Sequence, residues 1–239
     1  WFNRHVYEKE EVNIKNVTKD YGVLVLAGPK SRTILSQITS QNLNNNDFPW
    51  LKGKEILINK IPVRALRVNY VGELGWELHH PMNQMEALYD VICEVGKKEN
   101  IVNFGTYAVN SLRMEKAYRG WGAELTGEIS LVEAGMDRFF DLKRKKNFFG
   151  AKALQQKIQS GVDIKIVYLE VDADNADAMG NEPVYHNNKI VGVVTSGGYG
   201  FRTKKSLAFA YVKSDLANDG SLEIEIQGQK RKTKILDKV

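Results

Sequence analysis

The stretch Tyr70-Val71-Gly72-Glu73-Leu74-Gly75-Trp76-Glu77-Leu78-His79-His80 predicts a tight turn that leads into a β-strand. Residues 61–69, just before it, are rich in apolar and β-branched residues at near-alternating spacing, which is typical of a strand. Gly72 and Gly75 allow backbone angles that residues with a Cβ resist, so they suit a tight connection. The stretch therefore predicts a hairpin whose second strand begins near Trp76.

Glu77 is the candidate binding residue of this hairpin. Strand alternation places Trp76 and Leu78 on one face and Glu77 on the opposite face. A carboxylate has two acceptor oxygens, which suit a planar edge with two adjacent N–H groups, such as the amino-pyrimidinone edge of a pterin or a guanine, or an arginine. Alternatively, Glu77 faces solvent or pairs with Arg64 or Arg67.

Length and composition indicate an ordinary soluble globular protein. The 239 residues suffice for one or two domains with a substantial core, and 43% are hydrophobic and 26% charged. No apolar run approaches the roughly 18 residues of a membrane span, and no signal peptide is recognisable, so we expect no membrane partner. The single cysteine, Cys93, excludes an internal disulfide and a multi-cysteine metal site, and its helical position predicts a packed thiol in a reducing compartment.

The basic character of the chain does not predict a nucleic-acid partner. The formal net charge is +5, but the basic residues are dispersed among 29 acidic ones. The densest basic runs, residues 143–146 and 230–232, lack interleaved aromatic residues. We interpret them as solvated surface, and a mild attraction for a polyanionic small molecule is the alternative.

Residues 1–160 predict an α+β domain, an antiparallel sheet with helices. The chain opens with Trp1 rather than Met, so we expect it to be a piece of a longer polypeptide. Pro29 suits the first turn of a helix, and Asn147 suits the N-cap of another. The predicted strands cover residues 12–17, 21–27, 55–58 and 61–69, and the predicted helices cover residues 84–97, 106–117 and 149–159 and a short segment from Pro29.

An aromatic segment, Tyr118-Arg-Gly-Trp-Gly-Ala-Glu124, follows the helix predicted over residues 106–117. Glycines flank Trp121, so we expect its indole to lie on a loop. Loops carry a large share of binding residues, and a ring there can form one wall of a cleft. The alternative is that Trp121 plugs the core.

Residues 161–239 predict a small all-β domain, a barrel or a sandwich, because short strands alternate there with turn residues. The predicted strands cover residues 165–171, 189–195, 206–212, 222–226 and 231–236, and the predicted turns cover residues 187–188, 196–198 and 218–220.

An ordered set of motifs resembles the folate-binding aminomethyltransferase family, that of the glycine cleavage T-protein. Within the family, the likeness is closest to the C-terminal, folate-binding part of flavoproteins of the dimethylglycine and sarcosine dehydrogenase type. The motifs are Tyr21-Gly-Val-Leu, Ala27-Gly-Pro-Lys-Ser-Arg32, Tyr70-Val-Gly-Glu-Leu-Gly-Trp-Glu-Leu78, Asn103-Phe-Gly-Thr-Tyr107, Ser111-Leu-Arg-Met-Glu-Lys116, Val132-Glu-Ala-Gly135, Thr195-Ser-Gly197 and Lys205-Ser-Leu-Ala-Phe-Ala-Tyr-Val212.

The resemblance implies roles for particular side chains. Tyr70 and Glu77 match the pair that lines the pterin pocket, with the carboxylate at the 2-amino and N3–H edge. Trp121 stands where the T-protein has a tyrosine beside the folate. Arg113 lies in the matching helix as a weaker candidate for folate binding, and a structural ion pair with Glu115 or another acid is the alternative.

The chain also departs from the family pattern. Val109 stands where a family arginine falls, which weakens the transfer of contacts to the folate tail. The family's catalytic aspartate lies upstream of Trp1, so no catalytic residue is identifiable here. No dinucleotide fingerprint is present, and FAD would belong to a separate domain. We therefore expect this segment alone to be inactive.

The resemblance implies a tetrahydrofolate-dependent one-carbon transferase that yields methylene-tetrahydrofolate. Its carbon donor would be an N-methylated amine or an aminomethyl group, a missing N-terminal flavin or folate-domain part would complete it, and no metal is expected. We expect it in a bacterial cytoplasm or in the mitochondrial matrix. The alternatives are a glycine cleavage T-protein, a methyl-transferring demethylase and a non-catalytic relative of the same fold.

Overall fold

The structure is a computed structural model that describes residues 1–142 and 148–237. The chain forms two compact units. Unit 1 comprises Trp1–Asn69 and Glu73–Asn103, and unit 2 comprises Tyr70–Gly72 and Phe104–Val239. The domain boundary predicted after residue 160 lies inside unit 2 and stays a prediction.

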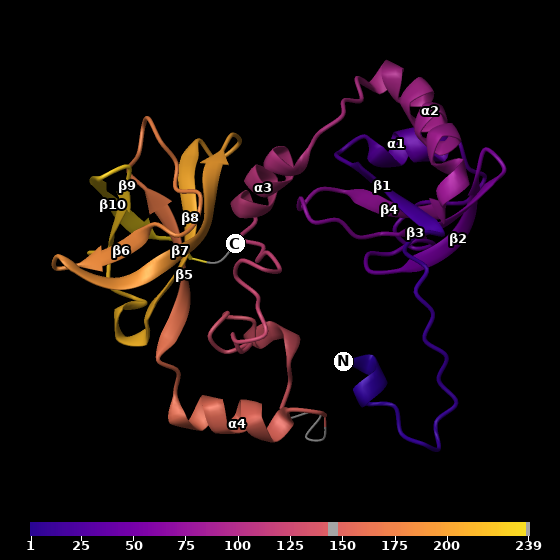
Figure 1. Cartoon of the computed structure of the whole chain (residues 1–239). Coiled ribbons are helices and arrows are strands. Elements are labelled where there is room, and N and C mark those ends of the chain that lie inside the picture. Colours follow the sequence, from indigo (N-terminus) through magenta and orange to yellow (C-terminus); the bar gives the residue numbers. More distant parts are fainter. Residues whose placement is uncertain (143–147, 238–239) are drawn as a thin grey trace. The chain divides into compact units, whose positions relative to one another are not determined.

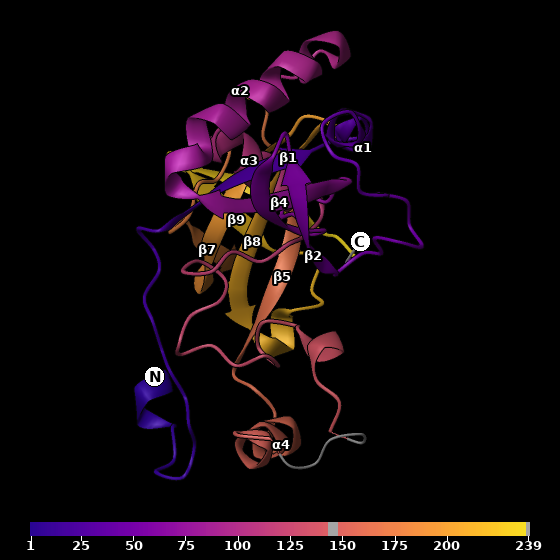
Figure 2. The same cartoon turned by 90° about the vertical axis from the view of Figure 1, so that its right-hand side faces the viewer.

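Unit 1 is an antiparallel sheet in the order β1-β4-β3-β2, with α1 and α2 on one face (Figure 1). The view in Figure 2 shows the same arrangement from the side. The strands and α-helices are β1 (Tyr21–Ala27), α1 (Ser31–Ser36), β2 (Gly53–Ile58), β3 (Ile61–Leu66), β4 (Gly75–Pro81) and α2 (Met85–Gly96). Short 3-10 helices cover Phe2–Arg4, Met82–Gln84 and Lys97–Glu99.

The predicted hairpin is confirmed, and its alternation fixes the core of unit 1. β3 and β4 pair antiparallel, with Ala65 opposite Leu78. Trp76 and Leu78 are fully buried beneath the helices, whereas Glu77 lies on the open face of the sheet. The Trp76 ring meets Phe48 edge-on at 6.2 Å between centroids. Burying each such side chain stabilises the fold by about 1.5–3 kcal/mol.

The two glycines of the hairpin serve different purposes. Gly72 has a φ of +70°, as a tight connection requires. Gly75 does not have a positive φ, so the prediction that unusual backbone angles require a glycine at this position is wrong. It lies opposite Ala27 of β1, where an added Cβ would come within 2.7 Å of the Leu26 carbonyl oxygen. Gly75 is therefore needed because two backbones approach closely.

The strand predicted over residues 12–17 is wrong. These residues have no regular structure, and Val12, Ile14 and Val17 are exposed. Alternating apolar residues form a strand only where a neighbouring strand takes up their backbone hydrogen bonds, and β1 pairs with β4 instead.

Three further details of unit 1 differ from the predictions. The apolar run at residues 21–27 is typical of a fully buried strand, but β1 is buried on one face only, since Val23 and Val25 are exposed on the other. The first α-helix begins at Ser31, so Pro29 precedes it. Cys93 is half-buried at the edge of the core rather than fully packed.

Unit 2 contains α3 and a closed antiparallel barrel in the order β10-β5-β8-β7-β6-β9, which confirms the predicted fold class. Met114 of α3 packs against barrel residues that include Tyr168 and Phe209. The α-helices and strands are α3 (Thr106–Glu115), α4 (Ala151–Ser160), β5 (Ile164–Val171), β6 (Pro183–His186), β7 (Lys189–Gly200), β8 (Lys205–Lys213), β9 (Glu223–Ile226) and β10 (Gln229–Ile235). Short 3-10 helices cover Asp137–Phe139 and Ser214–Leu216.

The barrel differs from the sequence prediction at two places. β6 was not predicted, because it has only four residues, begins with Pro183 and is interrupted by a bulge. The turn predicted over residues 196–198 lies within β7. Gly197 serves close packing there, since an added Cβ would come within 2.3 Å of the Ala178 carbonyl oxygen.

Two predictions fall on residues 143–147, outside the described part of the chain. They are the helix cap at Asn147 and the basic run at residues 143–146. The helix expected nearby is α4, which begins at Ala151 after Gly150.

Candidate functional site

Glu77 is half-buried on the open face of the unit 1 sheet. Its Oε2 lies 3.2 Å from Nε2 of His79, two residues along the same strand and on the same face. Its Oε1 has no hydrogen-bond partner among the described residues. Arg64 and Arg67 are engaged elsewhere, with Glu55 at 3.0 Å and with the Phe48 carbonyl oxygen at 2.6 Å. Glu77 thus keeps an acceptor oxygen for a ligand.

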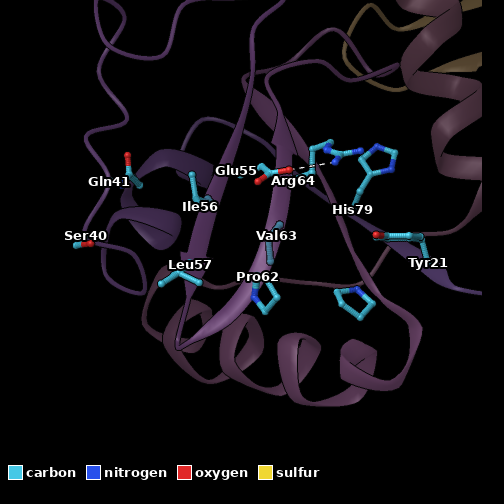
Figure 3. Close-up of a pocket in the computed structure, with 11 residues that line it drawn as sticks. Tyr21, Ser40, Gln41, Glu55, Ile56, Leu57, Pro62, Val63, Arg64 and His79 are labelled. Atoms are coloured by element: carbon cyan, nitrogen blue, oxygen red, sulfur yellow. Dashed lines mark hydrogen bonds and ion pairs between the residues drawn. The ribbon is translucent and has the colours of Figure 1, made fainter.

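A hollow of about 340 Å³ opens on the same face of the sheet, and one of the residues that line it is His79, the hydrogen-bond partner of Glu77 (Figure 3). A cross-strand row of Glu55, Arg64 and His79 runs along its polar side, and the dashed line in Figure 3 marks the Glu55–Arg64 ion pair. Its apolar side includes Leu57 and Pro62. The hollow therefore offers donors, an acceptor and an apolar floor.

Tyr70 belongs to unit 2, where it holds the segment that follows α3. Its hydroxyl donates a hydrogen bond to the Arg119 carbonyl oxygen at 2.5 Å, and its ring stacks on Tyr118 at 6.1 Å. Burial raises the pKa of the Tyr70 hydroxyl; the charge of Arg113 opposes this rise and that of Glu124 adds to it. Tyr70 is therefore neutral at physiological pH and acts as a donor.

Trp121 lies on the aromatic loop, which we define as residues 118–125. Its side chain is 82% exposed, so the interpretation as a core plug is wrong. The loop turns back on itself, because the Gly122 N–H donates to the Leu125 carbonyl oxygen at 2.8 Å. An exposed indole on a closed turn is available to stack on a planar ligand.

Arg113 is buried and takes part in an ion pair within unit 2. Its Nη1 donates to Oε2 of Glu124 and to the Tyr118 carbonyl oxygen, each at 2.9 Å. Its Nε and Nη2 donate to Oδ1 of Asn110 at 3.0 and 2.8 Å. The acid that pairs with Arg113 is thus Glu124, whereas Glu115 accepts from the Arg202 and Thr203 amides.

The structure groups some of the predicted residues and not others. Tyr70, Arg113 and Trp121 all contact or lie on the aromatic loop of unit 2, while Glu77 belongs to unit 1. Glu124 was not among the functional residues predicted from the sequence. Its partners include Thr195 and Ser196, about seventy residues later, and no spacing in the sequence links them.

Neither a metal centre nor a membrane span is found in the part of the chain that the structure describes. Among residues 1–142 and 148–237, no group of three or more His, Cys, Asp and Glu side chains is placed to hold a metal ion. None of the helices in these ranges is both long and apolar enough to cross a bilayer.

Comparison with known proteins identifies the family. Residues 1–144 match the family model described as the GCVT N-terminal domain, and residues 165–239 match the glycine cleavage T-protein C-terminal barrel domain. The chain belongs to the glycine cleavage T-protein family, which confirms the predicted resemblance.

Two relatives of the dehydrogenase type are similar to nearly the whole of this chain. The chain is 44% identical to human mitochondrial dimethylglycine dehydrogenase over 220 residues, which are 92% of this chain and 25% of that protein. It is 32% identical to human mitochondrial sarcosine dehydrogenase over 221 residues, 92% of this chain and 24% of that protein. It therefore spans about a quarter of the length of these dehydrogenases.

A solved structure of similar fold is the glycine cleavage system aminomethyltransferase T from Bartonella henselae. The TM-score is 0.76 at 24% sequence identity, over 91% of this chain and 58% of that one. This likeness supports the fold.

Proposed function

We propose that this chain is the folate-binding segment of a tetrahydrofolate-dependent one-carbon transferase of the dimethylglycine or sarcosine dehydrogenase type. In the whole enzyme, a carbon from an N-methylated amine or an aminomethyl donor would pass to tetrahydrofolate and give methylene-tetrahydrofolate. FAD would be bound by a separate domain. The family membership and the two dehydrogenase relatives support this proposal.

The observation that carries the proposal is the hydrogen bonding of the two Glu77 carboxylate oxygens. His79 holds Oε2, while Oε1 has no hydrogen-bond partner among the described residues. A half-buried carboxylate of this kind suits the 2-amino and N3–H donors of a pterin, because both ligand N–H groups need acceptors once water is excluded. Glu77 would orient the ring, and tetrahydrofolate itself would supply the nitrogen that accepts the carbon.

Within unit 2 we assign Tyr70 and Trp121 to contacts with the planar part of folate. Trp121 presents most of its indole to solvent, and Tyr70 is held in place by the hydrogen bond that its hydroxyl donates to the Arg119 carbonyl oxygen. For Arg113 we propose an indirect part, since it is buried and four of its five N–H donors are engaged by Glu124, Tyr118 and Asn110.

Calorimetric titration of the whole protein with tetrahydrofolate tests the assignment of Glu77. Glu77→Gln turns one acceptor into a donor that opposes the ligand N–H, so we expect folate binding to weaken by about 1–3 kcal/mol. Glu86→Gln is the matched control, because Glu86 is exposed on α2, on the helix side of the sheet. Equal affinity of Glu77→Gln and the wild type would overturn the assignment.

A product assay tests the reaction. We expect methylene-tetrahydrofolate, and methyl-tetrahydrofolate would instead indicate the methyl-transferring alternative. We propose that the whole protein is mitochondrial, because both dehydrogenase relatives are named as mitochondrial, and we assign it to the matrix; a bacterial cytoplasm is the alternative. Fluorescence microscopy of the tagged whole protein checks this location.

A further inference from the structure

We propose that Glu124 is a positioning residue that docks the aromatic loop onto the barrel and thereby fixes the orientation of Trp121. The consequence for folate rests on the proposed function. The docking itself is a property of unit 2 and can be measured without any ligand.

Glu124 is the buried member of an otherwise accessible loop. Its side chain is 0% exposed, whereas Trp121 and Gly122 of the same loop are exposed. Apolar burial therefore does little to hold the tip of the loop. The group that anchors the loop in the protein interior is a carboxylate, and its polar contacts decide where the loop lies.

The two oxygens of this carboxylate join different parts of unit 2. Oε2 accepts from the Gly120 amide at 2.6 Å and from Nη1 of Arg113 at 2.9 Å, which connects the start of the loop to α3. Oε1 accepts from the Thr195 hydroxyl at 2.7 Å and from the Ser196 hydroxyl, both on β7 of the barrel. One side chain thus links the loop, the helix and the barrel wall.

The loop backbone is held on both sides at residues 119 and 120. Tyr70 donates to the Arg119 carbonyl oxygen, and Glu124 accepts from the next amide, that of Gly120. An added Cβ at Gly120 would lie 3.3 Å from Oε2 of Glu124 and 3.5 Å from the Tyr70 hydroxyl. The contact is therefore tight, and a shift of Glu124 would be transmitted directly to Tyr70 and Trp121.

The electrostatics favour a role in conformational specificity. A carboxylate removed from water is costly unless charge and hydrogen bonds compensate it, and here Arg113 and three neutral donors do so. Buried ion pairs add little net stability compared with apolar packing, and in some proteins they serve instead to select one conformation; we assign that role to the Arg113–Glu124 pair. A loop position that withdrew Glu124 from this site would remove the carboxylate that pairs with the buried Arg113 guanidinium.

The test uses Glu124→Gln and Glu115→Gln in the whole protein. Glu115 is the matched control, a buried carboxylate of the same unit that accepts from the Arg202 and Thr203 amides, which do not belong to the aromatic loop. The protein is labelled with fluorotryptophan, and Trp121→Phe assigns the Trp121 fluorine signal. Calorimetry measures tetrahydrofolate affinity of the same samples.

We expect Glu124→Gln to broaden or split the Trp121 signal and to weaken tetrahydrofolate binding about tenfold, because it removes the charge that fixes the loop. Glu115→Gln should lower thermal stability and leave the Trp121 signal unchanged. If Glu124→Gln does not fold, the double variant Thr195→Val/Ser196→Ala replaces it, since it keeps the ion pair and removes the barrel donors to Oε1.

The Trp121 fluorine signal of the two variants decides whether Glu124 positions the loop. An unchanged Trp121 signal in the Glu124 variant overturns the positioning role, whether or not affinity falls. An equal change in the Glu115 variant also overturns it, because the effect would then be general destabilisation. A changed signal in a protein whose wild type binds no tetrahydrofolate supports the docking and refutes the proposed function.

Discussion

Gly75→Ala is expected to separate β1 from β4 in unit 1. The added Cβ would lie 2.7 Å from the Leu26 carbonyl oxygen and 3.0 Å from the Cα of Ala27. Both are backbone atoms, so no side-chain rotation relieves the clash. Ordinary contact begins near 3.4 Å, and the difference from 2.7 Å requires a strand shift of about 0.7 Å.

The expected cost follows from this geometry. Overpacking of a well-packed region costs about 1–3 kcal/mol. The adjoining hydrogen bond from the Gly28 amide to the Leu74 carbonyl oxygen, at 2.8 Å, is worth about 0.5–1.5 kcal/mol and would be strained by the same shift. Replacing glycine also restricts the unfolded chain, which returns about 0.4–1 kcal/mol. We therefore expect a net loss of about 1–3 kcal/mol in the free energy of unfolding.

Urea unfolding followed by tryptophan fluorescence measures this loss, since Trp76 is buried in the core of unit 1. Gly127→Ala is the control, because an added Cβ there meets no atom within 4 Å. We expect the control to match the wild type within about 0.5 kcal/mol. If Gly75→Ala also matches it, close backbone approach is not the reason for glycine at this position.

Two further predictions concern stability. Leu78→Ala should lower the free energy of unfolding by about 2–5 kcal/mol, because Leu78 is fully buried. Leu57→Ala should change it by less than about 0.5 kcal/mol, because the Leu57 side chain is 59% exposed. Urea titration compares the two variants, and equal losses would contradict the assigned faces of the sheet. Burial raises the pKa of the Glu133 carboxyl, but hydrogen bonds from Lys157 and Ser130 outweigh burial and hold this pKa below 4.5. The ionised carboxylate therefore stabilises the fold above pH 4.5, and this contribution is lost as the pH falls through the folded-state pKa. Thermal unfolding should therefore depend less on pH in Glu133→Gln than in the wild type below about pH 5, and parallel acid profiles would show that Glu133 contributes nothing.

Local patterns predicted the parts of the fold that depend on local causes. The alternation around Trp76 identified the β3–β4 hairpin and placed Glu77 on the open face, because side chains of a strand point alternately to its two faces. The same rule failed for residues 12–17, since alternation does not reveal whether a neighbouring strand exists. The segment Ser196-Gly-Gly198 resembled a turn, but it lies inside β7, where Gly197 serves close packing.

The candidate site was predictable only in part for the same reason. Glu77 and His79 are two residues apart on one strand, so their proximity follows from the pleat. Arg113 and Glu124 meet because α3 and the aromatic loop fold back on each other, and the hydroxyl partners come from a strand more than seventy residues away. Such long-range contacts are decided by tertiary packing and leave no periodic signal in the sequence.

The closure of the barrel has a consequence for synthesis of the chain. β10 pairs with β5 on one side and with β9 on the other, so residues 229–235 close the ring. Until they emerge from the ribosome, β5 and β9 each present a row of unpaired amide and carbonyl groups. Such rows recruit strands from other molecules. A premature stop codon before Gln229 would therefore leave β5 and β9 as two exposed edge strands, and we expect the shortened product to aggregate.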